Sequence, residues 1–157
     1  MYFRLHKLFF ILMKITIGRI DKGDFPELEL TDIDVKIDSG AYTSSIHCTN
    51  IEEIRVNNIK FIKFTLLDPE HPLYNNKVFS SKNYTTRVVK SSNGATEERF
   101  AIQTEIILFN KTYTIDLTLT ERSDMKFPVL LGRKFLNKKF IIDSSRTNLS
   151  YKLKIKK

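Results

Sequence analysis

The chain has 157 residues, a formal net charge of +8 and a single cysteine, Cys48. This length corresponds to about one domain of roughly 150 residues, and a lone cysteine excludes an internal disulfide framework. Eighteen Ile, fourteen Thr and six Val stand against three Ala, and this excess of β-branched residues predicts a mainly β protein. We therefore expect a globular domain of a reducing compartment, the cytoplasm.

Residues 1–12 differ in composition from the rest of the chain. The apolar run 8–13 is too short to cross a bilayer, which needs roughly 20 residues, and no small-x-small cleavage site follows it. These residues are either a weak secretion signal or an upstream extension before a true start at Met13. We expect a single domain over residues 13–157 and no association with a membrane.

Turn-prone residues divide the remaining chain into short strands and one short helix. The helix is expected from Arg133 to about Asn137, and residues 71–82 are expected to form a polar loop. Asn93-Gly94 is typical of a two-residue type I′ turn and would join residues 84–91 to 97–103 in a long hairpin. The predicted strands are 14–20, 33–37, 44–48, 52–56, 59–66, 84–91, 97–108, 111–120, 128–131, 140–143 and 148–155.

Charge is distributed unevenly along the chain. Residues 133–157 hold nine Lys or Arg and one Asp, whereas residues 21–38 hold seven acidic side chains and two lysines. Apolar residues and lysines alternate over 149–156, which indicates a strand. The lysines either protect a strand edge from aggregation or form a cationic binding surface.

Asp38-Ser39-Gly40 follows an apolar strand and is the densest candidate for chemistry. Glycine permits a tight turn in which neighbouring amides hold a carboxylate rigid at the end of a strand. By itself such a tripeptide is more typical of an ordinary Asx turn.

A second motif, Phe127-Pro128-Val129-Leu130-Leu131-Gly132-Arg133, changes that interpretation. Together the Asp-Ser-Gly loop and the apolar pair before Gly-Arg resemble retropepsin-like aspartic proteases. The resemblance covers nearly all of the chain from about residue 13, and it implies an all-β fold: a closed retropepsin-like barrel with a flap hairpin and one short C-terminal helix. It is closest to the RimB-type group, long labelled ATP-dependent zinc proteases, through Gly18-Arg19, residues 36–47, Glu98-Arg99, residues 125–136 and residues 142–146.

The resemblance implies that Asp38 is the catalytic aspartate of a peptidase and that Ser39, Gly40 and Ala41 complete its loop. Aspartic proteolysis needs two carboxylates that share a proton, one activating water and the other polarising the scissile carbonyl. The chain has one Asp-Ser-Gly, so the second aspartate would come from an identical subunit across the two-fold axis of a homodimer.

The dimer geometry stays open because of one departure from the retroviral pattern. Retroviral enzymes carry an acid that helps to brace the arginine matched by Arg133, and Tyr42 replaces that acid here. Either Arg133 finds another partner or this group dimerises differently.

The residues do not support the older label of a zinc and ATP enzyme. Zinc needs three or four ligands, and the chain has three histidines, among them His6, and one cysteine; His47 and Cys48 would point to opposite faces of a strand. The chain contains no H-E-x-x-H and no glycine-rich loop for phosphate. We expect no metal and no cofactor, and His47 either packs within a strand or lines the cleft.

A glutamate-rich substrate would suit the positive charge of the chain, and the RimB-type resemblance implies the trimming of glutamate tails. The predicted function is an aspartic endopeptidase acting on peptides or proteins, either glutamate-rich or general. The alternative is a non-catalytic binding module for a protein or RNA partner, and we do not expect the peptidase to bind nucleic acid. Basic and hydroxyl residues near the motifs are the candidates for substrate binding: Lys36, Thr43, Ser44, His47, Arg99 and Arg133.

Overall fold

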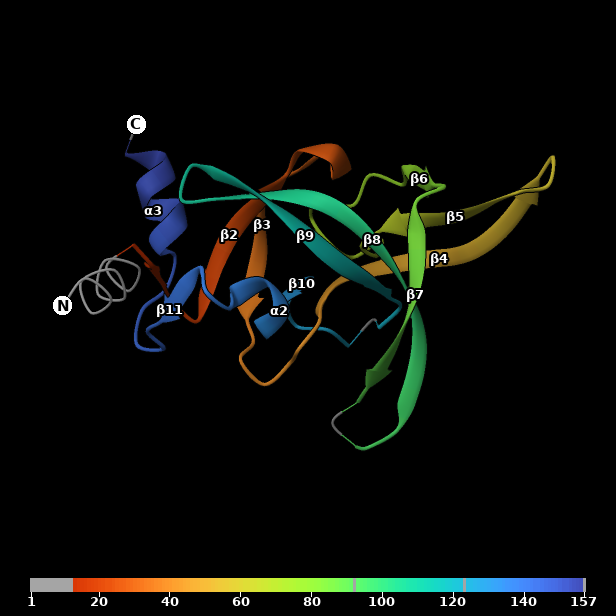
Figure 1. Ribbon diagram of the computed structural model, residues 1–157. Helices are drawn as coiled ribbons and strands as arrows, with labels where there is room; N and C mark the ends of the chain where they lie inside the picture. Colours follow the sequence, from red (N-terminus) through yellow and green to blue (C-terminus); the bar gives the residue numbers. More distant parts are fainter. Residues whose placement is uncertain (1–12, 92, 123, 157) are drawn as a thin grey trace, which may run out of the picture.

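A computed structural model describes residues 13–91, 93–122 and 124–156 (Figure 1). It confirms the mainly β prediction, because strands cover most of these residues and the helices are short. The segment 1–12, for which a leader or an upstream extension was expected, lies outside the described residues. The strands are β1 (Ile15–Ile17), β2 (Ile20–Phe25), β3 (Leu30–Ile37), β4 (Ser44–Val56), β5 (Ile59–Leu66), β6 (Val78–Ser81), β7 (Tyr84–Lys90), β8 (Thr96–Leu108), β9 (Lys111–Thr120), β10 (Val129–Leu131) and β11 (Phe140–Ile142).

The helical segments are η1 (Pro26–Leu28), α2 (Arg133–Leu136) and α3 (Leu149–Ile155). The short helix α2 lies where the sequence predicts one. Within the described part of the chain, no helix is long and apolar enough to cross a membrane.

The larger sheet follows a path that returns on itself. Strand β10 pairs in parallel with β3 and antiparallel with β4, and β4 connects through β9, β8 and β2 back to β3. The link between β2 and β8 is a single residue pair, Asp24 with Ile107. We therefore describe a ring of paired strands, which is a coarser statement than the closed barrel expected from the sequence.

The core lies inside this ring. Alternate residues of β3 point inward, among them Ile33 and Val35 with no exposed surface, as expected for strands with one buried face. Val129 and Leu131 of β10 are equally buried. The short strand β10 is therefore fixed both by its two neighbours and by the core beneath it.

Two ribbons extend from the ring in different directions (Figure 1). One is formed by the outer parts of β4 and β5 and the other is the β7–β8 hairpin, which lies where a flap hairpin was expected. The two-residue type I′ turn is wrong: the Ser91 N–H donates to the Ala95 carbonyl at 2.8 Å, and Lys90 pairs with Thr96. Gly94 has a φ of 84°, a left-handed conformation that glycine adopts readily.

The segment 148–155 is an α-helix and not the predicted strand. Asp21 of β2, which has no exposed surface, accepts hydrogen bonds from the N–H groups of Ser150 at 2.8 Å and Tyr151 at 3.0 Å. Amides of a first helical turn have no partner within the helix, so this distant carboxylate stabilises α3. Lys154 on α3 contacts Asp24 of β2 at 2.8 Å.

Three further differences have local causes. The predicted strand 14–20 divides at Gly18, where a Cβ atom would lie 2.2 Å from the Arg146 carbonyl oxygen. The predicted strands 44–48 and 52–56 form one strand, β4, with a bulge between Thr49 and Glu52. Strand β6 forms within the predicted polar loop because it pairs with β5, where the rings of Phe79 and Phe64 stack.

Candidate functional site

Asp38 lies directly after β3, at the point where β10 pairs with that strand. Its N–H donates to the Leu131 carbonyl at 2.9 Å, which fixes the backbone of Asp38 against β10. Its Oδ1 atom accepts the N–H of Gly40 at 3.0 Å, and this is the hydrogen bond of an Asx turn. The carboxyl group is half-buried and keeps Oδ2 without a hydrogen-bond partner among the described residues.

Gly132 brings the Asp38 loop onto the start of α2. A Cβ atom at Gly132 would lie 2.6 Å from the carbonyl oxygens of both Tyr42 and Thr43, so only glycine allows this approach. The Arg133 N–H then donates to the Ala41 carbonyl at 2.9 Å. The two motifs that stand far apart in the sequence therefore form one rigid floor.

This floor borders a cleft of about 730 Å³, a volume within the usual range for ligand sites. Strand β7 and the adjoining part of the hairpin line the cleft opposite the Asp38 loop. The lining residues are Asp38, Gly40, Ala41, Tyr42, Thr43, Ser45, Val88, Val89, Lys90, Ser91, Arg99, Arg122, Leu130 and Arg133. They include four cationic side chains and one carboxylate, so the cleft is suited to an anionic ligand.

Two of the arginines in the cleft are held in place by neighbours. The Arg99 Nε atom lies 2.8 Å from the Glu97 carboxylate, and the Arg99 side chain is only 9 % exposed. The hydrogen bond from Arg99 lowers the pKa of Glu97, which keeps this pair ionised. Arg133 donates to the Ser39 carbonyl at 2.9 Å and lies over the Tyr42 ring at 5.9 Å. The residue that replaces the bracing acid thus contacts the same arginine through its aromatic face.

The structure brings six of the residues expected from the sequence into the cleft, and it places the others nearby. Ser39 and Lys36 are exposed and do not line the cleft; Ser39 contributes its carbonyl group to Arg133. Ser44 is buried and its Oγ atom accepts the Gly132 N–H at 3.0 Å. The six cleft residues are Asp38, Gly40, Ala41, Thr43, Arg99 and Arg133.

His47 is a buried strand residue and is not among the residues that line the cleft. Its side chain is buried, with Nε2 at 3.1 Å from the Asp68 carboxylate. His47 Nδ1 lies 3.2 Å from the Arg122 backbone nitrogen and 3.3 Å from the Thr120 carbonyl oxygen. His47 therefore supports the segment that carries Arg122.

Arg122 and Lys90 are the basic residues of the cleft that sequence reasoning missed. Arg122 follows the end of β9 and Lys90 ends β7. Their positions at or near strand ends could have identified them as candidates, because binding residues commonly lie where strands enter loops.

The described residues contain no group of three or more His, Cys, Asp or Glu side chains placed to hold a metal ion. His6 lies outside the described residues. Cys48 is buried in the core.

Comparison with known proteins gives a family and a fold. A family model described as "RimB-like: Retropepsin-like aspartic endopeptidase RimB" matches residues 16–152, which confirms the resemblance found in the sequence. A crystal structure of a protein of unknown function from Legionella pneumophila is similar with a TM-score of 0.69 and 27 % identity, covering 87 % of this chain and 98 % of that chain.

Curated relatives have a different name. Proteins of Shewanella pealeana and Shewanella halifaxensis are each 36 % identical over 138 residues, or 85 % of this chain and 29 % of the relative. A protein of Desulfotalea psychrophila is 36 % identical over 136 residues, or 84 % of this chain and 28 % of the relative. Each is named "Probable alpha-L-glutamate ligase". This chain spans less than a third of the length of these relatives.

These names correct the function expected from the sequence, an aspartic endopeptidase. The relatives are named as enzymes that join glutamate, not as enzymes that hydrolyse peptide bonds. Asp38 is the one carboxylate among the residues of this chain that line the cleft.

Proposed function

This chain belongs to the RimB-like family of retropepsin-like proteins, and we propose that it forms the acceptor-binding part of an enzyme that joins glutamate to peptides. In this role the cleft holds an acidic peptide while a separate ligase part performs the chemistry. The name of the curated relatives supports the substrate class. The length of those relatives supports a division of labour, since more than two-thirds of each lies outside the match.

The observation that carries the proposal is the charge of the cleft. Lys90, Arg99, Arg122 and Arg133 line it beside one carboxylate. Arg99 and Arg122 also pair with Glu97 and Asp124 outside the lining, so Lys90 and Arg133 supply the cationic charge that has no carboxylate partner among the described residues. A glutamate-rich peptide would be attracted to such a surface by long-range steering. It would then be fixed by hydrogen bonds from guanidinium groups, which match carboxylates in two-pronged geometry. Because Arg99 is already oriented by Glu97, little side-chain entropy would be lost at that contact.

The open edge of β7 provides a second means of binding. Strand β7 pairs with β8 on one side and with no other strand among the described residues. An extended peptide can add to such an edge through main-chain hydrogen bonds. The alternate side chains of the peptide would then point toward the cationic residues of the cleft.

Asp38 would shape the loop in this scheme. Its Oδ1 atom holds the Gly40 N–H, and its negative charge would oppose an acidic ligand. We therefore expect the isolated chain to bind oligoglutamate without cleaving it. The retropepsin-like protease class expected from the sequence makes the opposite forecast, namely that new peptide termini appear.

A binding measurement tests the proposal. Fluorescein-labelled hexaglutamate, hexaserine and hexalysine are titrated with the protein at low and moderate salt, and the anisotropy is recorded. We expect selective binding of hexaglutamate that weakens with salt and weakens roughly tenfold in Arg99→Gln or Arg122→Gln, as for loss of a hydrogen bond to a charged group. The control is Lys111→Gln, which removes an exposed charge at the start of β9.

Two results would overturn the proposal. One is equal binding of hexaserine and hexaglutamate, because it removes the role of charge. The other is cleavage of hexaglutamate by the wild type, seen by mass spectrometry and lost in Asp38→Asn, because it would assign a hydrolase. The mass of the particle in solution is measured alongside, since the homodimer expected from the sequence remains a proposal.

A further inference from the structure

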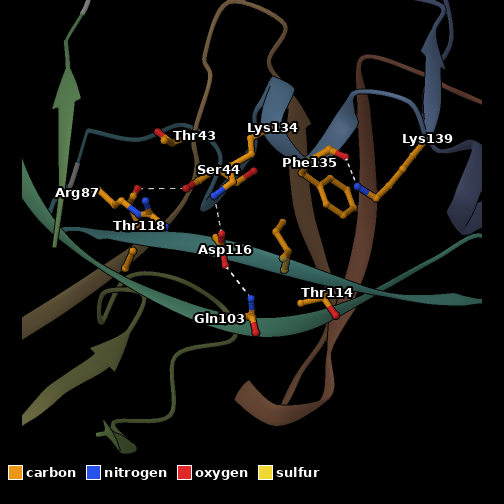
Figure 2. A pocket seen from close by; sticks show the side chains of 12 residues that line it. Thr43, Ser44, Arg87, Gln103, Thr114, Asp116, Thr118, Lys134, Phe135 and Lys139 are labelled. Atoms are coloured by element: carbon orange, nitrogen blue, oxygen red, sulfur yellow. Dashed lines mark hydrogen bonds and ion pairs between the residues drawn. The ribbon is translucent and has the colours of Figure 1, made fainter. Parts of the chain in front are cut away.

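A second pocket, of about 120 Å³, adjoins the cleft (Figure 2). Thr43 lines both spaces. In two places, consecutive residues line different spaces. Arg133 lines the cleft and Lys134 lines the pocket, and likewise Val88 lines the cleft and Arg87 lines the pocket. The pocket is thus a side chamber of the cleft. Its lining is Thr43, Ser44, Arg87, Ala101, Gln103, Thr114, Ile115, Asp116, Thr118, Lys134, Phe135 and Lys139.

Asp116 and Lys134 neutralise each other inside the pocket. The Lys134 Nζ atom lies 2.7 Å from Asp116 Oδ2, and the Gln103 amide donates to Asp116 Oδ1 at 3.2 Å. The hydrogen bond from Lys134 is the largest cause that lowers the pKa of Asp116, and the charge of Arg87 adds to it. This carboxylate is therefore ionised and already has its partners.

Two cations in the pocket remain without a counter-charge. Within the described part of the chain, no carboxylate lies at ion-pair distance from Arg87 or Lys139. Lys139 donates to the Phe135 carbonyl at 2.9 Å and its Nζ atom lies over the Phe135 ring. Figure 2 shows Arg87 and Lys139 on opposite sides of the Asp116–Lys134 pair. Each of these two cations therefore lines the pocket without a carboxylate partner among the described residues and can bind an anionic group of a ligand.

The remaining surface of the pocket matches a short aliphatic stem. The side chains of Ile115 and Phe135 supply apolar contact, and those of Ser44, Thr114 and Gln103 supply polar groups. The pocket has about one-sixth of the volume of the cleft. It can therefore take one side chain, whereas the cleft can take several residues of an extended peptide.

We propose that this pocket binds a glutamate unit whose α- and γ-carboxylates are both free, which is the C-terminal residue of the peptide held in the cleft. The inference rests on the proposed function and adds an end-specific subsite to it. A C-terminal glutamate carries two carboxylates, one for Arg87 and one for Lys139. An N-terminal glutamate would bring an ammonium group, which the same two cations repel. The subsite therefore recognises the C-terminal end of a glutamate chain and not its interior.

The test compares peptides that differ at one end. Hexaglutamate with a free C-terminus, its C-terminal amide and its N-acetylated form are measured by calorimetry against the wild type, Arg87→Gln and Lys139→Gln. We expect amidation to weaken binding to the wild type about tenfold, as for loss of a hydrogen bond to a charged group, and N-acetylation to leave it unchanged. In Arg87→Gln and Lys139→Gln the free acid and the amide should bind alike. The matched control is Lys138→Gln, an exposed neighbour of Lys139 outside the pocket lining.

The outcomes separate this inference from the proposed function. If no form of hexaglutamate binds, the proposed function fails. If the free acid and the C-terminal amide bind the wild type equally, the cleft stands and the end-specific subsite is overturned. Free L-glutamate is the other source of the same two carboxylates. If it displaces the peptide from the wild type but not from Arg87→Gln, the pocket belongs to the free amino acid and the assignment to a chain end is overturned.

Discussion

Gly132→Ala should destabilise the protein at the floor of the cleft. The added Cβ would lie 2.6 Å from the carbonyl oxygens of Tyr42 and Thr43, whereas ordinary contact begins at 3.4 Å, so the loop must retreat by about 0.8 Å. That displacement strains the hydrogen bonds from Arg133 N–H to Ala41 and from Lys134 N–H to Tyr42, both 2.9 Å long. Overpacking costs about 1–3 kcal/mol and two hydrogen bonds about 1 kcal/mol each. We expect the free energy of unfolding to fall by roughly 3–5 kcal/mol.

Urea titration measures this loss. The chain has no Trp, so unfolding is followed by far-UV circular dichroism, and an unchanged slope would show that only stability has changed. The control is Gly40→Ala, whose Cβ would meet only the Asp38 side chain, at 3.3 Å; it should cost less than about 1 kcal/mol. A Gly132→Ala variant within about 0.5 kcal/mol of the wild type would refute the claim that close approach at residue 132 builds the floor.

Four further predictions follow from other contacts. Asp21→Ala removes the acceptor of two first-turn amides of α3 and should lower the free energy of unfolding by about 2–3 kcal/mol; an unchanged urea midpoint would contradict the anchoring role. Burial raises the pKa of the Cys48 thiol, so iodoacetamide should alkylate the unfolded chain only, and rapid alkylation in native buffer would contradict this. Because Lys134 lowers the pKa of Asp116 from its ordinary 3.8, Asp116→Asn should cost less than about 1 kcal/mol above that pH. The cost should vanish as the pH falls through the lowered pKa; a cost that grows on acidification would be inconsistent with the ion pair. Asp38→Asn keeps an acceptor for Gly40 but removes one negative charge, so hexaglutamate should bind about twofold more tightly, the Coulomb energy of one charge at about 8 Å in water; weaker binding in the anisotropy assay would show that the carboxylate contacts the ligand.

The local sequence pattern predicts most of the strands, because their inward residues alternate with outward ones and turn residues mark their ends. The resemblance to retropepsin-like proteases, and not the local pattern, predicts that Asp38 and Gly132 belong to one site. The structure shows how the two motifs meet, although Asp38 and Gly132 lie 94 residues apart in the sequence.

The errors occur where distant contacts override the local pattern. The alternation over 149–156 fits a strand, but the Asp21 carboxylate is buried against this segment and accepts helical amides. The acidic segment 21–38 and the basic C-terminal segment are also partners, because Lys154 contacts Asp24 and Asp32. These contacts raise the pKa of Lys154, mainly through its hydrogen bond to Asp24. Part of the positive charge of the C-terminal segment therefore forms ion pairs with the acidic segment 21–38.

The cleft residues that lie inside the recognised motifs were predicted more often than those outside them. Arg99 and Arg133 were found because they lie inside recognisable motifs, and both line the cleft. Lys36 lies on the outer face of β3, where the alternation of the strand turns it away from the cleft. Arg122 lies between the motifs, two residues after the end of β9, and its backbone nitrogen contacts His47.

The position of β10 between β3 and β4 has a consequence for folding rate. Val129 pairs with Val35, 94 residues earlier, and with Ile46, 83 residues earlier. Closing such long loops costs entropy before any contact repays it, and proteins dominated by distant pairings fold slowly. The hairpins β4–β5, β7–β8 and β8–β9 can form early, each from neighbouring segments. We expect the three residues of β10 to join last, so that the chain acquires its binding floor in the final step of folding.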